Sequence, residues 1–218
     1  MKKTLRTLHR YLGLLLAGFL IIAGISGSIL TFNSEFDALL NPDLYRINQA
    51  GQPSSSSEAL VKAVEAWDKR IRIYYLPLPT HPVRASVVYV EGVTDPGTGE
   101  PFDIPYDEVF LNPVMAEVTG ARMWGECCGR ENFLPMTHKL HNRLFLPTSI
   151  GRPLWGSVAV LWTIMALIGL VLTWPEVKPR LQLWGKNWKI KWGLPILPMM
   201  LNLHRATGLW FWLVIIPI

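Results

Sequence analysis

The sequence has little charge and almost no cysteine. Only 17% of the 218 residues are charged, whereas 50% are hydrophobic; an average soluble domain has about 25% charged residues. This composition argues against a disordered chain and against a wholly soluble protein. Because the two cysteines, Cys127 and Cys128, are adjacent, a scaffold stapled by several disulfides and a four-cysteine zinc site are both excluded. A vicinal disulfide with a role in a redox relay is conceivable, but two structural cysteines in a loop are the simpler interpretation.

Motifs for nucleotide binding are also missing. No G-x-G-x-x-G follows a predicted strand, and the chain contains no P-loop. We therefore expect no hydride or flavin chemistry on this chain itself. Any redox function would need another molecule as the electron donor.

Positive charge is concentrated beside two long uncharged runs. The 24 residues from Tyr11 to Ser34 and the 23 residues from Pro153 to Pro175 contain no charged side chain. Residues 1–11 carry a net charge of +4 and residues 176–205 a net charge of +5, whereas residues 35–152 carry −4. Because the basic residues flank apolar runs, the excess charge favours a lipid bilayer as the partner and argues against nucleic acid.

Both uncharged runs are long enough to span a membrane, since a bilayer core about 30 Å thick needs about 20 apolar residues in a helix. The basic flanks place the N-terminus and the loop after the second run in the cytoplasm, and the region between the runs on the opposite side. A cleaved signal peptide is the alternative for the first run. We favour a retained span because the run exceeds the usual length of about 7–15 apolar residues and lacks a clear A-x-A cleavage site.

A third apolar run, from Ala206 to Ile218, has only thirteen residues. As a helix it would cover about 20 Å, so we expect a helix that begins near Leu203 and is truncated. This length favours the front part of a longer protein over a short re-entrant end.

The region between the two spans is predicted to be a small α+β module. Ser55 and Glu58 have capping-box spacing before an amphipathic stretch that ends at Trp67. Segments rich in β-branched and aromatic residues then predict antiparallel strands at 71–76, 83–90, 108–111 and 117–119. The acidic residues of this module are scattered, and we expect them to form a solvated face. Of the five histidines in the chain, only His81 belongs to this module, and it lies between Thr80 and Pro82 in a predicted loop.

An internal repeat is the clearest signal in the sequence. The pattern L-H-R-x-x-G-L occurs at the cytoplasmic start of the first and third apolar helices, which places the two histidines at matching depth in the membrane. The two copies are Leu8-His9-Arg10-Tyr11-Leu12-Gly13-Leu14 and Leu203-His204-Arg205-Ala206-Thr207-Gly208-Leu209.

This spacing suits a haem. Histidine and glycine at i and i+4 lie on one helix face, so the imidazole can ligate iron while the glycine leaves room for a flat porphyrin, and the arginine can pair with the propionates. Two imidazoles from facing helices hold haem in many helical bundles. The alternative is an interfacial His-Arg anchor with a glycine that serves helix packing. The predicted haem-binding residues are His9, Arg10, Gly13, His204, Arg205 and Gly208.

A partial third copy, Leu140-His141-Asn142-Arg143-Leu144, precedes the second span. If a haem also lies on that side, His141 is the preferred ligand, with His138 on roughly the same helical face as the alternative. The partner ligand would come from a span beyond Ile218. Zinc or copper could also bind such a pair, but no further soft or acidic ligands lie nearby in the sequence.

With these motifs, the Gly169-Leu-Val-Leu-Thr-Trp-Pro175 exit and the Phe110-Leu-Asn-Pro hairpin, the chain resembles the PepSY-associated transmembrane family. That family includes iron-regulated membrane proteins and siderophore-iron reductases of the bacterial inner membrane. The resemblance implies a bundle that holds b-type haems through helix-end histidines and carries electrons from a cytoplasmic donor to a ferric siderophore in the periplasm. His9, His204 and His141 match the family's histidines by position.

The expected fold is therefore a membrane α-helical bundle, with two complete spans and a truncated third, that carries a periplasmic PepSY-like α+β insert. The alternative function is a non-redox membrane-anchored protein whose insert binds a peptide or protein partner. The expected parts are the cytoplasmic N-terminus with the first span (1–34), the insert (35–130), a pre-helix segment (131–152), the second span (153–175), a basic cytoplasmic loop (176–202) and the start of the third helix (203–218).

Overall fold

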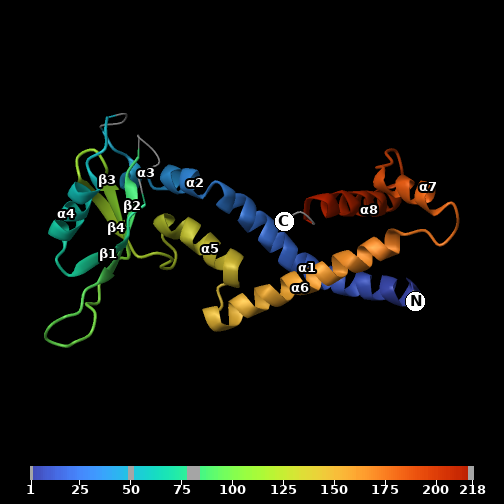
Figure 1. Ribbon diagram of the computed structural model, residues 1–218, viewed down its shortest axis with the longest axis horizontal. Coiled ribbons are helices and arrows are strands. Elements are labelled where there is room, and N and C mark those ends of the chain that lie inside the picture. Colours follow the sequence, from blue (N-terminus) through green and yellow to red (C-terminus); the bar gives the residue numbers. More distant parts are fainter. Residues whose placement is uncertain (1, 49–51, 78–83, 216–218) are drawn as a thin grey trace. The chain divides into compact units, whose positions relative to one another are not determined.

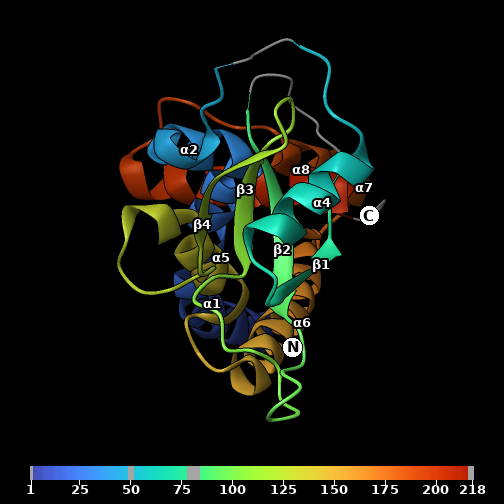
Figure 2. The ribbon, with the colours of Figure 1, turned by 90° about the vertical axis from the view of Figure 1, so that its left-hand side faces the viewer.

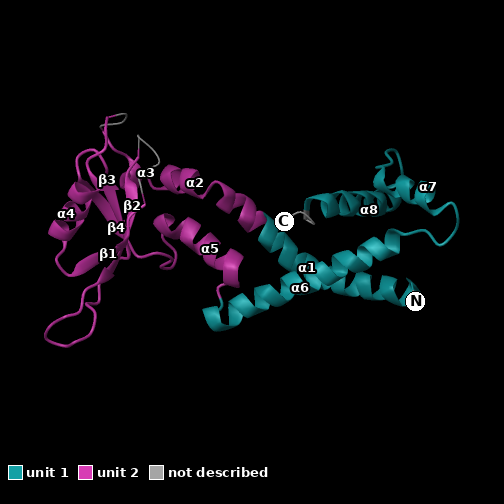
Figure 3. Ribbon diagram, viewed as in Figure 1, with its two compact units in different colours: residues 1–24, 146–218 teal, residues 25–145 magenta. Residues whose placement is uncertain are grey.

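The computed structural model describes residues 2–48, 52–77 and 84–215. The chain forms two compact units (Figure 3). Unit 1 contains residues 1–24 and 146–218, and unit 2 contains residues 25–145. Unit 2 is wider than the insert predicted from the sequence, because it also takes in the end of the first helix and the segment after residue 130.

Unit 1 is helical. It contains most of α1 (Lys2–Thr31) and all of α6 (Thr148–Thr173), and both helices are long and apolar enough to cross a membrane. The two helices pack through Leu16 of α1 and Val158 and Met165 of α6, with partly buried apolar residues around them. Their other faces expose large apolar side chains, as expected for helices in contact with lipid.

The rest of unit 1 consists of α7 (Arg180–Gly185), the 3-10 turn η2 (Lys186–Trp188) and α8 (Ile196–Ile215). The third apolar helix therefore begins at Ile196, seven residues before the start expected from the sequence. Pro195 and Pro198 lie at this start, and proline is tolerated in the first turn of a helix, where its missing N–H has no intrahelical acceptor.

Four tryptophans of unit 1 pack against one another in sequence order. Successive ring centroids are 5.3, 5.3 and 5.4 Å apart along the row Trp174, Trp184, Trp188 and Trp210. The indole N–H of Trp184 donates to Thr173 Oγ1 and that of Trp210 donates to the Trp188 carbonyl. This row joins the end of α6 to α7, η2 and α8 at the basic end of the helices.

Unit 2 is built on a four-stranded antiparallel sheet in the order β1-β2-β3-β4 (Figure 2). The strands are β1 (Ile71–Tyr75), β2 (Ser86–Gly92), β3 (Glu108–Asn112) and β4 (Glu117–Arg122). All four strands were predicted, although β2 and β4 run further than expected; Val83 and His81 lie outside the described residues. A strand alternates its side chains between two faces, so Val88, Val90, Val109 and Leu111 share the face that packs on α4.

Helix α4 (Ser57–Trp67) covers that face (Figure 1). Its cap is Ser56, whose Oγ accepts a hydrogen bond of 3.2 Å from the Ala59 N–H. The predicted capping residue, Ser55, instead donates to the Val114 carbonyl at 2.8 Å. In a run of four serines the spacing alone could not select the capping residue.

The opposite face of the sheet is covered by α2 (Asn33–Leu40), α3 (Pro42–Tyr45) and α5 (Phe133–Arg143), with the turn η1 (Arg130–Asn132) before α5 (Figure 1). A second core lies on this side around Ile47, Ala85 and Phe110. The insert thus has a hydrophobic core on each face of its sheet.

Truncating the α4 core should destabilise the insert. Leu60 is 1% exposed and packs on the sheet, so Leu60→Ala should lower its free energy of unfolding by about 2–5 kcal/mol. Leu39→Ala, at a side chain that is 73% exposed, should change it by about 0.5 kcal/mol or less. Amide hydrogen exchange of β3 in the intact protein measures both changes; equal effects would contradict this description of the core.

Candidate functional site in the helices

The structure brings the two repeated histidines together. His9 lies near the start of α1 and His204 lies in α8, and their ring centroids are 6.1 Å apart with the ring planes at 60°. The two side chains are far apart in the sequence, and both belong to unit 1. This pair forms the centre of the candidate site.

The His9 imidazole also lies against the backbone of α6. A Cβ atom built on Gly169 would be 3.2 Å from His9 Cε1, closer than most side-chain contacts. The glycine that makes room for this ring is therefore Gly169 of a neighbouring helix. Gly13 and Gly208, which the motif indicated as leaving room for a porphyrin, have space beside them: a Cβ atom on Gly13 would meet only Met165 Cε, at 4.0 Å, and one on Gly208 would meet no atom within 4 Å.

Two buried polar atoms of the repeated motif have no hydrogen-bond partner within the described ranges. They are Nδ1 of His9 and Nε of Arg205, and both atoms are buried. The two predicted arginines thus differ, because Arg10 is exposed, donates to the Tyr11 hydroxyl at 3.0 Å and stacks on the Tyr11 ring. A buried polar atom without a partner is costly, so this end of unit 1 has capacity to bind a further group.

His141, in unit 2, also packs against a glycine of a neighbouring helix, as His9 does. A Cβ atom on Gly27 of α1 would lie 3.2 Å from His141 Cε1, and the neighbouring Ser26 hydroxyl is 2.9 Å from His141 Nδ1. Ser26 is 2% exposed. The serine orients the imidazole through one ring nitrogen and leaves Nε2 for another interaction, the arrangement seen for histidines that bind metals.

His138 lies on the same helix but has different neighbours. Its ring makes an edge contact with Trp124, with centroids 5.4 Å apart, and is 3.0 Å from the Asn142 amide nitrogen. Burial lowers the pKa of His138, and the nearby His141 and Arg143 lower it further. His138 therefore contacts Trp124 and Asn142, whereas His141 contacts Ser26, so the two histidines of α5 have different partners.

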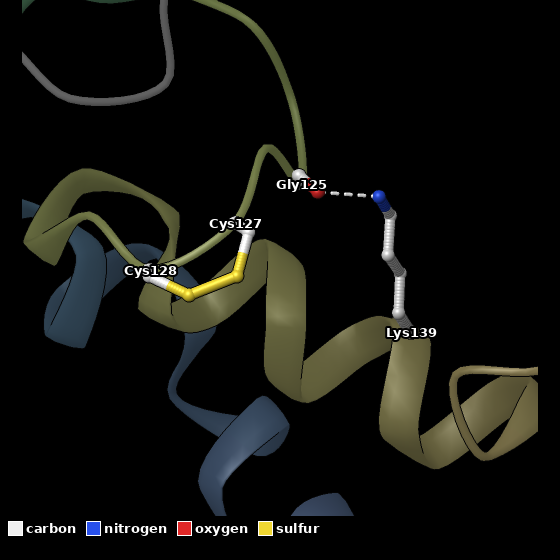
Figure 4. The surroundings of a disulfide bond; sticks show 4 residues. All are labelled: Gly125, Cys127, Cys128 and Lys139. Carbon is white, nitrogen blue, oxygen red and sulfur yellow. Dashed lines mark hydrogen bonds between the residues drawn. A yellow bond between two sulfur atoms is a disulfide. The ribbon is translucent and has the colours of Figure 1, made fainter.

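The two cysteines form a vicinal disulfide in the exposed loop between β4 and η1. Figure 4 shows this loop beside α5, where the Lys139 ammonium donates to the Gly125 carbonyl. The Gly125 N–H donates to Asn132 Oδ1 at 2.7 Å. These contacts attach the loop to the helix that carries His141.

The expectation that the acids of the insert form a solvated face is wrong for two of them. Asp37 and Glu108 are each 2% exposed and both bind Arg122, which is 7% exposed. Arg122 Nη2 lies 2.7 Å from Asp37 Oδ2, and its Nε lies 2.6 Å from Glu108 Oε2. The Tyr45 hydroxyl also donates to Asp37 Oδ2 at 2.7 Å. No sequence pattern indicated this cluster, because its members come from α2, β3 and β4.

Sequence reasoning also missed Ser26, Gly27 and Gly169. Each acts across a helix contact, so only the packing of the helices reveals its role. The one available signal was that Gly169 is the first residue of the segment Gly169-Leu-Val-Leu-Thr-Trp-Pro175, with which the second span ends.

Comparison with known proteins agrees with the helical architecture. A search of curated proteins finds no match. The model of the PepSY-associated TM region matches residues 6–218, which includes the two candidate spans, the insert and the histidine repeat. The chain is a membrane protein of the PepSY-associated TM region family.

Proposed function

We propose that this protein binds haem b in the bacterial inner membrane and takes part in electron transfer to a ferric siderophore or a similar oxidised substrate in the periplasm. The observation that carries the proposal is the pairing of His9 and His204, whose ring centroids are 6.1 Å apart. The two residues occupy the same position in a repeated motif on two different helices.

The residues at this site fit such a group. Two imidazoles that held one metal ion would each bring a ring nitrogen to about 2 Å from it. A centroid separation of 6.1 Å is compatible with that arrangement. A haem propionate would also supply the acceptor that the buried Nε of Arg205 lacks, since carboxylates pair well with guanidinium groups.

Bound haem supplies a one-electron redox couple whose potential depends on the axial ligands and on burial. The protein contributes the position of the two imidazoles and an apolar environment. Gly169 lets the His9 ring lie close to α6, and the packing of Leu16 against Met165 fixes α1 on α6. Together they restrict where the His9 side chain can lie.

In this proposal His141 would be a ligand of a second haem, on the periplasmic side. Ser26 holds one of its ring nitrogens at 2.9 Å, which fixes the ring orientation as an outer-shell partner does in metal sites. With the basic termini of the spans in the cytoplasm, His9 and His204 lie at the inner face and His141 lies at the periplasmic side. Electrons would then enter from a cytoplasmic donor, which is another molecule.

Haem content tests this proposal. The purified intact protein should give a reduced-minus-oxidised spectrum with a b-type band, and His9→Ala or His204→Ala should each remove most of that band, because either change removes an imidazole that would hold the haem. His81→Ala is the matched control and should retain it. Circular dichroism of the purified protein shows whether the helices of each variant are folded. A folded wild-type protein without any haem band, after expression with added haem precursor, would contradict the proposal.

The second candidate function places the activity in the insert and treats the helices as an anchor. The observation in its favour is a cavity of about 470 Å³ in unit 2, because a cavity of that volume suits a small ligand or one side chain of a partner. An optically silent protein that binds a ligand through the insert would support this function over electron transfer.

A further inference from the structure

The cavity of unit 2, here called the insert cavity, lies on the sheet face opposite α4. Val87, Tyr89 and Glu108 line it, and they alternate along their strands with the residues that pack on α4. Side chains of α2, α3 and α5 close the other side, among them Asp37, Tyr45 and His138. The described residues that line the cavity therefore all belong to the insert and its flanking helices.

A row of three side chains forms part of the cavity wall. Tyr89, Glu108 and Arg122 are register partners on β2, β3 and β4, so they lie side by side across the sheet. All three line the insert cavity. The row presents an aromatic ring, a carboxylate and a guanidinium group in that order.

The charges of this buried cluster do not balance. Two carboxylates, Asp37 and Glu108, share the single guanidinium group of Arg122, which leaves one negative charge in excess. Both oxygens of Asp37 accept hydrogen bonds, from Arg122, Asn41 and Tyr45. Within the part of the chain that the structure describes, Glu108 accepts only at Oε2, from Arg122 Nε.

Glu108 is thus the incompletely satisfied member of the cluster. It is 2% exposed and lines the cavity, and its Oε1 receives no hydrogen bond from the described residues. Burial raises the pKa of Glu108, and Arg122 opposes that rise. A buried carboxylate with a free oxygen is costly unless a cation or a hydrogen-bond donor reaches it.

The aromatic residues of the cavity favour a cation beside Glu108. Tyr89 and Trp124 line the cavity, and aromatic faces attract ammonium and guanidinium groups. Arg122 is already held by two carboxylates, so it has little capacity for an anion. Arg84 also lines the cavity and carries a second guanidinium group, but Arg84 is only half-buried and its Nη1 donates to the Ser34 carbonyl at 3.4 Å.

We propose that the insert cavity binds a small ligand through a protonated amine or guanidinium group, with Glu108 as its anionic partner and Tyr89 and Trp124 beside it. A monocation makes the buried cluster neutral. The proposal does not depend on haem binding, and it holds for either candidate function.

Calorimetric titration of the intact protein in detergent tests the ligand class. Three probes share a phenyl group and differ at the other end: phenethylammonium, 2-phenylethanol and 3-phenylpropionate. Phenethylammonium should bind at least tenfold more tightly than the alcohol, and the carboxylate should bind most weakly. A carboxylate probe that binds as tightly as the ammonium, or an ammonium probe with no saturable binding, would overturn the proposal.

Variants at Glu108 test the residue itself. Glu108→Gln keeps the shape and removes the charge, so the preference for the ammonium over the alcohol should fall by at least tenfold, whereas Glu108→Asp should retain a preference. Glu117→Gln, at an exposed residue of the same sheet, is the matched control and should behave as wild type. An unchanged preference in Glu108→Gln would overturn the assignment. Haem absorbance is recorded separately, so failure of this proposal is distinct from failure of the proposed redox function.

Discussion

Replacement of Arg122 by methionine is expected to lower the free energy of unfolding of the insert by about 3–5 kcal/mol, because it leaves Asp37 and Glu108 as buried carboxylates without their cation. The Asp37 side chain is 3% exposed and that of Arg122 is 6% exposed, so water in the cavity beside them can replace the lost contacts only in part. Amide hydrogen exchange of β3, measured in the intact protein, reports the change.

The matched control for this prediction is Arg72→Met. Arg72 pairs with Glu91 at 2.8 Å, but both side chains are largely exposed, and such pairs contribute about 0–1 kcal/mol. A second test adds Asp37→Asn to Arg122→Met, which should recover part of the loss by removing one buried charge. If Arg122→Met cost no more than Arg72→Met, the buried cluster would have no special role in the insert.

The second large effect is expected at Gly169. A valine there would place its Cβ 3.2 Å from His9 Cε1 and would add two methyl groups beyond that Cβ, so the imidazole must move away from α6. Under the proposed function, Gly169→Val should therefore reduce haem content at least tenfold, equivalent to about 1.4 kcal/mol of binding free energy. The haem-to-protein ratio of the purified protein measures this effect without any change to the ligands themselves.

Gly156→Val provides the control on the same helix, since no atom lies within 4 Å of a Cβ at Gly156. It introduces the same side chain into α6 and should leave the haem content near that of wild type. Gly169→Ala should give an intermediate result, because a shift of a few tenths of an ångström would accommodate its methyl group. Equal haem content in the two valine variants would contradict the role assigned to Gly169.

Local patterns in the sequence predicted the two spans, α4 and the four strands, but not α2, α3 or α7. The two uncharged runs correspond to α1 and α6, and the alternating segments correspond to the four strands, because hydrophobic periodicity records which face of an element is buried. The start of α8 was missed, since proline at a helix N-terminus resembles proline in a loop. The capping residue was displaced by one position within a run of equivalent serines.

The candidate sites were predictable only in part. The repeated motif identified His9 and His204, which the structure brings together. Their neighbour Gly169 and the contact of His141 with Ser26 depend on which helices pack side by side, and a single sequence does not contain that information. The cluster of Asp37, Glu108 and Arg122 depends in the same way on strand register, which decides whether an acid is buried or solvated.

The central claim is that His9 and His204 bind the same haem iron, and electron paramagnetic resonance of the oxidised protein tests it most directly. Two imidazole ligands hold ferric haem in a low-spin state, so the wild-type spectrum should be low-spin. His204→Ala should convert one low-spin species into a high-spin species or remove its haem, and His9→Ala should affect the same species. If both variants retained the complete low-spin spectrum of the wild type, neither imidazole would be a ligand and the claim would be wrong.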